Sequence, residues 1–145
     1  MNAETFLEQY GTIAATIRRK QRLKEKLEAQ TVNITSHLTP DKVQSSGSMQ
    51  KVAEAVEEAL DLEKEIKELF VRKNEARKLI EGVINQISGK PGEVLYEKYL
   101  ILNNEDVIAE AIDRTEDTVY RLLKEGKEKV QKILDEECSE ITENA

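Results

Sequence analysis

The sequence predicts an all-α protein, in which a long antiparallel helical hairpin of the coiled-coil type precedes a C-terminal pair of shorter helices. Charged residues make up 35% and aromatic residues 4% of the 145 residues, a composition that suits long solvated helices more than a thick globular core. Apolar residues recur every three or four positions along most of the chain. Prolines and glycines cluster mainly at residues 40–47 and 89–92, which divides the chain into three helical blocks.

The middle block has the most regular apolar spacing and predicts a heptad seam. Its members are Val52, Ala55, Ala59, Leu62, Ile66, Leu69, Lys73, Ala76, Ile80, Val83 and Ile87. A single helix cannot bury such a stripe alone, so it needs a partner helix. The N-terminal block offers a matching face, made of Phe6, Tyr10, Ile13, Ile17, Leu27 and Ile34. We therefore expect a hairpin domain over residues 1–88, with a mobile polar loop near residues 35–48.

Charge indicates the same pairing independently. Arg18 to Lys26 carry a net charge of +5, and Glu54 to Glu68 carry −5. Folding the chain near residue 42 brings these stretches together, so that facing residue numbers add to about 85 and Arg22 lies opposite Glu63. The alternative interpretation of the basic stretch is a nucleic-acid patch. The hairpin is also the surface through which we expect a homodimer.

The segment from Asn103 to Gly126 has the apolar spacing of a helix-turn-helix. Ile108, Ala109 and Ile112 share one helical face, and Val119, Leu122 and Leu123 repeat that face after a short gap. Thr115 is the expected N-cap of the second helix. The positions left to face DNA, which are our candidate contacts, are Thr115, Glu116, Asp117, Thr118, Tyr120, Arg121 and Lys124.

This pattern resembles the helix-turn-helix of sigma factor region four. Asp113 stands at the turn position usually held by glycine, and aspartate tolerates the left-handed conformation better than most residues. The segment VLYEKYL, Val94 to Leu100, provides the extra helix that steadies such a motif, with Lys98 either at the surface or on a phosphate. The expected helix-turn-helix domain spans residues 93–135, and an acidic tail follows at 136–145.

Over residues 1 to 135 the chain resembles the phage sigma-like family found in prophages of Gram-positive bacteria. Three landmarks carry the resemblance: DLEKEI at Asp61 to Ile66, VLYEKYL at Val94 to Leu100, and VYRL at Val119 to Leu122. Lys98 replaces the arginine usual in the family, and the tryptophan that often opens the first motif helix is absent. The resemblance implies a late transcription regulator with double-stranded DNA and host RNA polymerase as partners.

The charge of the C-terminal part limits the affinity that we expect for DNA. From Glu93 to Ala145 there are seven basic and fifteen acidic residues. Phosphate neutralisation supplies most nonspecific affinity, so an acidic module binds weakly and with strong salt dependence. Within the second helix, expected at residues 116–134, five basic residues outnumber four acidic ones. We therefore expect useful affinity to need a dimer or RNA polymerase.

Several classes of function are disfavoured. No histidine pairs with the carboxylates, and there is no glycine-rich phosphate loop or nucleophile elbow, so we expect no enzyme and no cofactor. The single histidine, His37, lacks a metal-ligand partner at a suitable spacing, and Cys138 cannot form an internal disulfide. No signal peptide and no apolar run near twenty residues is present, so we expect a cytoplasmic protein with no membrane partner.

The sequence therefore predicts a phage or prophage DNA-binding transcription regulator that is sigma-like and reads DNA through the helix at 116–134. Two alternatives stay open. A DNA-packaging subunit of the small-terminase type also pairs a helix-turn-helix with helical oligomerisation elements, although its DNA motif usually comes first. An acidic helical adaptor would bind a protein partner and never touch DNA.

Overall fold

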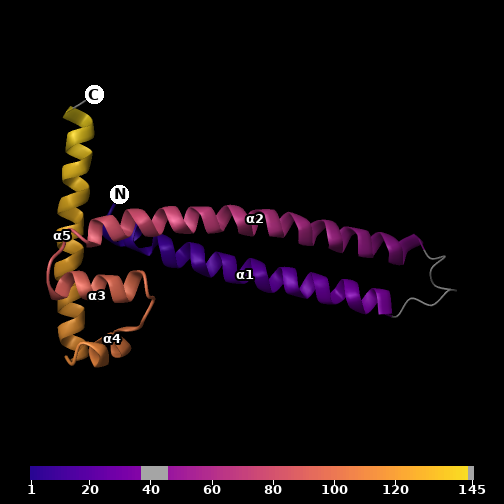
Figure 1. Cartoon of the computed structure of the whole chain (residues 1–145), viewed down its shortest axis with the longest axis horizontal. Coiled ribbons are helices and arrows are strands. Elements are labelled where there is room, and N and C mark those ends of the chain that lie inside the picture. Colours follow the sequence, from indigo (N-terminus) through magenta and orange to yellow (C-terminus); the bar gives the residue numbers. More distant parts are fainter. Residues whose placement is uncertain (37–45, 144–145) are drawn as a thin grey trace. The chain divides into compact units, whose positions relative to one another are not determined.

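The computed structural model describes the backbone of residues 1–36 and 46–143 and the side chains of residues 1–33 and 49–139. The predicted all-α class is confirmed, since the described residues form helices and no strand. The helices are α1 (Ala3–Ser36), α2 (Ser46–Ile84), α3 (Lys90–Tyr99), α4 (Glu105–Ala111) and α5 (Glu116–Glu143), coloured from indigo to yellow in Figure 1. None of these helices is long and apolar enough to cross a membrane.

The chain divides into two compact units. The terminal unit comprises Met1–Thr12 and Lys73–Ala145, and the inserted unit comprises Ile13–Arg72. Both α1 and α2 therefore contribute to each unit. The expected loop at 35–48 and His37 lie outside the described residues, except that α1 reaches Ser36 and α2 begins at Ser46.

In the inserted unit, α1 and α2 run side by side in opposite directions (Figure 1). Lys20 Nζ lies 2.7 Å from Glu65 Oε2, and these residue numbers add to 85, the sum that the charge pattern predicts. The expected partner of Arg22, Glu63, instead forms an ion pair with Lys67 one turn along α2, at 3.7 Å. These ion pairs are exposed, so each contributes only about 0.2–1 kcal/mol.

The interior of the inserted unit is thin. Its buried apolar residues are Ala14, Ile17, Ala55, Ala59 and Ile66. Alanines let two helices approach closely but remove little apolar surface from water. Leu62 and Leu69 of the predicted seam are half-buried, as are Ile13 and Leu27 on α1, while the side chain of Ile34 lies outside the described residues.

The terminal unit holds the main core. Fully buried large side chains come from every one of its helical segments, namely Leu7, Ile80, Val94, Leu95, Ile108, Val119 and Val130. The first part of α5 packs against α3 and α4, which also contact each other. The pattern of Val119, Leu122 and Val130 along α5 places one continuous apolar face toward these helices, so α5 is the central element of the unit.

Two glycines allow close approach of backbones in this core. A Cβ atom on Gly92 would lie 2.2 Å from the carbonyl oxygen of Ile87, and one on Gly126 would lie 2.8 Å from Leu95 Cδ1. Real Cβ contacts are never this short without displacement of the neighbour. Helix α3 can therefore sit against the end of α2 and against α5 only because both positions lack a side chain.

The start of the chain is joined to α5. The backbone N–H of Ala3 donates to Gln131 Oε1 at 2.8 Å, and Lys127 Nζ lies 3.9 Å from Glu4 Oε1. Lys73, the charged member of the predicted seam, lies with its Nζ 5.3 Å from the centroid of the Tyr10 ring. A cation over an aromatic face is attracted by the ring quadrupole, which offers a physical reason for a lysine at a seam position.

Helix α5 is longer than the sequence pattern predicts. It continues nine residues beyond Leu134, to Glu143, and so includes most of the expected acidic tail. The side chains of residues 135–139 are exposed. Glutamate has good helix propensity and no glycine or proline interrupts residues 135–143, so the helix can extend through this stretch.

Candidate nucleic-acid interface

The turn between α4 and α5 has the hydrogen bonds of a Schellman motif. Asp113 adopts φ 55°, the left-handed conformation expected for the turn position. The N–H of Asp113 donates to the carbonyl of Glu110 at 3.3 Å, and the N–H of Arg114 donates to Ala109 at 2.9 Å. These bonds satisfy carbonyl groups at the end of α4 that would otherwise lack partners. The turn thus fixes the direction in which α5 begins.

Thr115 caps the beginning of α5, as its sequence position predicts. The N–H of Thr118 donates to Thr115 Oγ1 at 3.3 Å, and the two threonine hydroxyls are 3.0 Å apart. An N-cap hydroxyl of this kind contributes about 0.5–2 kcal/mol to helix stability. The hydroxyl groups of Thr115 and Thr118 therefore both stabilise the N-terminus of α5.

Asp113 provides a direct test of the turn. We expect Asp113→Gly to raise the free energy of unfolding relative to Asp113→Ala by about 1 kcal/mol, because only glycine adopts a positive φ without a Cβ penalty. Both variants remove the carboxylate, so their difference isolates backbone conformation. Urea unfolding followed by circular dichroism measures it, and equal stabilities would contradict a left-handed residue at 113.

The candidate DNA contacts share one side of α5. Val119, Leu122 and Leu123 are buried against the other helices. Of the residues selected from the sequence, only Thr118 is half-buried; the exposed ones are Thr115, Glu116, Asp117, Tyr120, Arg121 and Lys124. Tyr120 is 55% exposed, which is unusual for an aromatic residue that serves only the fold.

The charges on this surface differ in how they are engaged. Lys127 and Lys129, further along α5, form ion pairs with Glu4 and Glu125 at 3.9 and 3.6 Å. Within the described part of the chain, Arg121 and Lys124 have no ion pair. Two exposed cations near the beginning of α5 are thus available for an anionic ligand.

The beginning of α5 also carries two acidic residues, Glu116 and Asp117. Carboxylates in the first helical turn interact favourably with the positive end of the helix dipole, so they stabilise α5. They also oppose the approach of phosphate groups to that turn. Arg121 and Lys124 lie one to two turns further along α5, away from these carboxylates in sequence.

Lys98, for which the sequence left a role on phosphate open, is engaged within the protein. Its ammonium group forms an ion pair with Glu105 at the beginning of α4 and lies 5.8 Å from the centroid of the Tyr99 ring. The hydrogen bond from Lys98 lowers the pKa of Glu105. Burial, followed by the charges of Glu4, Glu8 and Glu105, raises the pKa of Tyr99 to about 12. Lys98 thus ties α3 to α4.

The connection between α3 and α4 has little local signal in the sequence. Leu102 adopts φ 68°, a strained value for a bulky residue, and its Cδ2 would lie 3.2 Å from a Cβ on Gly11. The N–H of Asn103 donates to the carbonyl of Glu97 at 3.0 Å, and its side chain donates to Glu97 Oε2 at 2.9 Å. An asparagine after a run of apolar residues is the one local signal for such a helix end.

The described residues contain no group of three or more histidine, cysteine or acidic side chains arranged to hold a metal ion. Cys138 is an exposed cysteine on α5. The exposed side of α5 with Tyr120, Arg121 and Lys124 is therefore the candidate site. Searches of protein-family models, curated proteins and solved structures gave no significant match to this chain.

Proposed function

We propose that this protein is a phage or prophage DNA-binding transcription regulator of the sigma-like kind, with a cytoplasmic location. In this proposal α4 and α5 form a helix-turn-helix and the first half of α5 enters the major groove of DNA. Its partners are double-stranded DNA, host RNA polymerase and a second copy of the chain. The observation that supports the proposal best concerns Arg121 and Lys124, two exposed cations that form no ion pair with any described residue, beside the exposed Tyr120.

The geometry of α5 suits a reading helix. Buried Val119 and Leu123 pack one side of its first turns against the other helices, and Thr115 caps its N-terminus. The exposed side of these turns is therefore held in a defined orientation. A rigid helix is needed if side chains are to meet base edges in register. Arginine at position 121 can donate two hydrogen bonds to a guanine, and lysine at 124 can contact a phosphate.

The acidic residues predict the character of the binding. Glu116 and Asp117 can accept hydrogen bonds from cytosine amino groups but repel phosphates. With two cations on the contact surface, the electrostatic part of the affinity is small and strongly dependent on salt. We therefore include RNA polymerase among the proposed partners, because it would supply contacts with DNA that this helix lacks.

The test is fluorescence anisotropy with duplex DNA at low salt. We expect the full chain to bind and the double variant Arg121→Ala with Lys124→Ala to bind at least about tenfold more weakly, because each lost contact costs about 1–3 kcal/mol if it is to a base. The matched control is Arg72→Ala with Lys64→Ala, which removes one arginine and one lysine from exposed positions of α2.

Three outcomes would overturn the proposal. They are no binding by the wild-type chain at low salt, equal loss in the control variant, and full binding by the Arg121 and Lys124 variant. The first would favour the acidic adaptor, an alternative to which the excess of eight negative charges after residue 92 points. Binding by a ring of many subunits, seen by light scattering, would favour the DNA-packaging alternative.

A further inference from the structure

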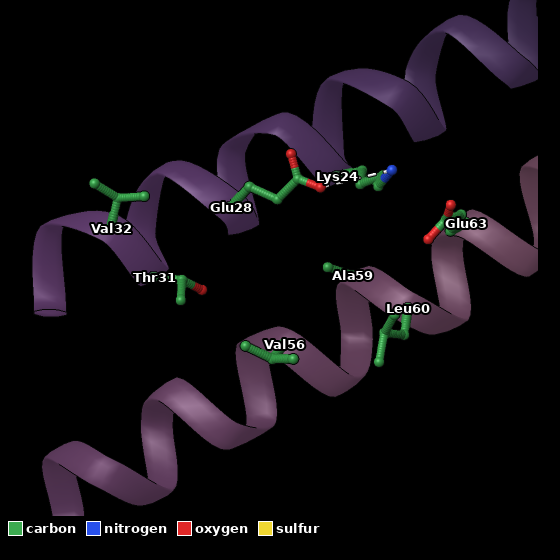
Figure 2. Close-up of a pocket in the computed structure, with 8 residues that line it drawn as sticks. All are labelled: Lys24, Glu28, Thr31, Val32, Val56, Ala59, Leu60 and Glu63. Carbon is green, nitrogen blue, oxygen red and sulfur yellow. Dashed lines mark ion pairs between the residues drawn. The ribbon is translucent and has the colours of Figure 1, made fainter.

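The inserted unit has an open apolar groove on one side of the two helices. Its lining comes from both α1 and α2, and its volume is about 310 Å³. Figure 2 shows Thr31 of α1 pointing toward α2, where Val56 and Ala59 lie, with Lys24 and Glu63 at one end of the groove. Val32 of α1 and Leu60 of α2 also line the groove, and Lys24 forms an ion pair with Glu28. Val32, Val56 and Leu60 are 66%, 43% and 54% exposed, although they are aliphatic.

Two of these exposed residues, Val56 and Leu60, belong to a second regular stripe on α2. Met49, Ala53, Val56 and Leu60 are spaced by four, three and four positions, which is the spacing of a helix–helix contact. All are exposed, and the seam that faces α1 is a different set of residues, including Ala55, Ala59 and Ile66. Helix α2 thus carries one apolar stripe for α1 and another, the outer stripe, that α1 does not cover.

The packing of the inserted unit indicates that the outer stripe is buried against a further partner. Every fully buried large side chain in the described part of the chain lies in the terminal unit, and none lies between residues 13 and 72. Pairs of long helices reach a full core when two further helices complete a four-helix bundle. The inserted unit has the length and the apolar surface for half of such a bundle.

The charges of α1 and α2 indicate which partner binds to the groove and the outer stripe. The two helices of the inserted unit have opposite charge, with +5 over residues 18–26 of α1 and −5 over residues 54–68 of α2. A second copy therefore offers an acidic helix to every basic helix. A partner of uniform charge would be attracted to one helix and repelled by the other.

We propose that the groove and the outer stripe form a homodimer interface, in which two inserted units make a four-helix bundle about a two-fold axis parallel to the helices. This axis places α1 of each copy beside α2 of the other, antiparallel and at equal height. Positions whose numbers add to about 85 then meet between copies as they do within each copy. A two-fold axis perpendicular to the helices would stack α1 on α1 or α2 on α2, and so place like charges together.

This inference deepens the dimer part of the proposed function and does not depend on DNA binding. Light scattering after gel filtration of the full chain, without DNA, tests it. We expect twice the monomer mass of 16.5 kDa. Val56→Glu with Leu60→Glu should reduce the mass to that of the monomer with unchanged helical circular dichroism, because both positions are exposed in a single copy.

The matched control is Leu79→Glu with Val107→Glu, which makes the same chemical change at positions 63% and 44% exposed in the terminal unit. This control should stay dimeric. Leu60→Ala, which adds no charge, should weaken the dimer by about tenfold in a dilution series. A monomeric or higher-order wild-type chain, a dimeric Val56 and Leu60 variant, or a monomeric control would overturn the interface, whatever the result of the DNA measurement.

Spin labels test the direction of the axis. Single cysteines replace the exposed residues Glu57, Asp61 and Glu68 in a Cys138→Ser background, and the distance between labels on the two copies is measured. The parallel axis predicts nearly equal distances at the three positions. A perpendicular axis predicts distances that change with position, because each residue advances about 1.5 Å along the helix.

Discussion

Replacing Gly92 with alanine is expected to lower the free energy of unfolding by about 3 kcal/mol or more. The new Cβ would lie 2.2 Å from the carbonyl oxygen of Ile87 and 3.2 Å from its carbonyl carbon. The obstacle is backbone rather than the end of a flexible side chain, so it cannot rotate away. Helix α3 must therefore move, and its buried residues Val94 and Leu95 must lose contacts with α5. Denaturant unfolding followed by circular dichroism measures the change.

Gly82→Ala is the matched control for this prediction. Gly82 lies in α2, and a Cβ added there would meet no atom within 4 Å. Alanine has a higher helix propensity than glycine, so this variant should be more stable than the wild type by about 0.8–1 kcal/mol. The two substitutions thus have opposite expected signs. A Gly92→Ala variant as stable as Gly82→Ala would mean that α3 does not approach the end of α2 as described.

Leu95→Ala is expected to lower the free energy of unfolding by about 2–5 kcal/mol. Leu95 has no exposed surface and lies on α3, the helix that supports α5. Its removal leaves a cavity that the rigid helices around it can close only in part. Leu79→Ala, at a position 63% exposed, makes the same chemical change and should alter stability by no more than about 0.5 kcal/mol. Equal effects at both positions would contradict the buried place of Leu95.

The cavity at Leu95 can be refilled from the opposite helix. A Cβ on Gly126 would point at Leu95, 2.8 Å from Cδ1 and 2.9 Å from Cγ. Gly126→Ala should therefore crowd the wild-type core more than the Leu95→Ala core, in which the carbonyl oxygen of Pro91, 3.2 Å from the new Cβ, is the remaining close neighbour. We expect the double variant to lose at least about 1 kcal/mol less than the sum of the single losses. Strict additivity would show that the two residues are not in contact.

Local sequence patterns predicted the elements near the candidate site well. The apolar spacing of Ile108, Ala109 and Ile112 identified the buried side of α4, and Val119, Leu122 and Leu123 identified that of α5. Asp113 and Thr115 took their expected conformations because turns and caps depend mostly on neighbouring residues. Surface positions of α5 followed from the same periodicity, so the candidate contacts could be placed on one side of the helix.

Long-range features could not be predicted in the same way. The ion pair of Lys127 with Glu4 removes one cation from the set available to DNA, and it joins residues far apart in sequence. The sequence pattern assigned no role to Gly126, but in the structure this glycine allows close packing against Leu95. The exposed stripe that includes Val56 and Leu60 was not recognised in the sequence, because the apolar spacing of the neighbouring seam is longer and more regular.

The hydrogen bond between Ala3 and Gln131 joins residues 128 positions apart and has a consequence for synthesis on the ribosome. Residues 1–12 pack into a unit whose other members begin at residue 73, so they are synthesised well before the residues that bury them. Domains usually fold in the order in which they are made. Here the inserted unit is synthesised before its host unit is complete, so we expect the apolar Phe6 and Leu7 to stay exposed to solvent until the residues after 72 have been made.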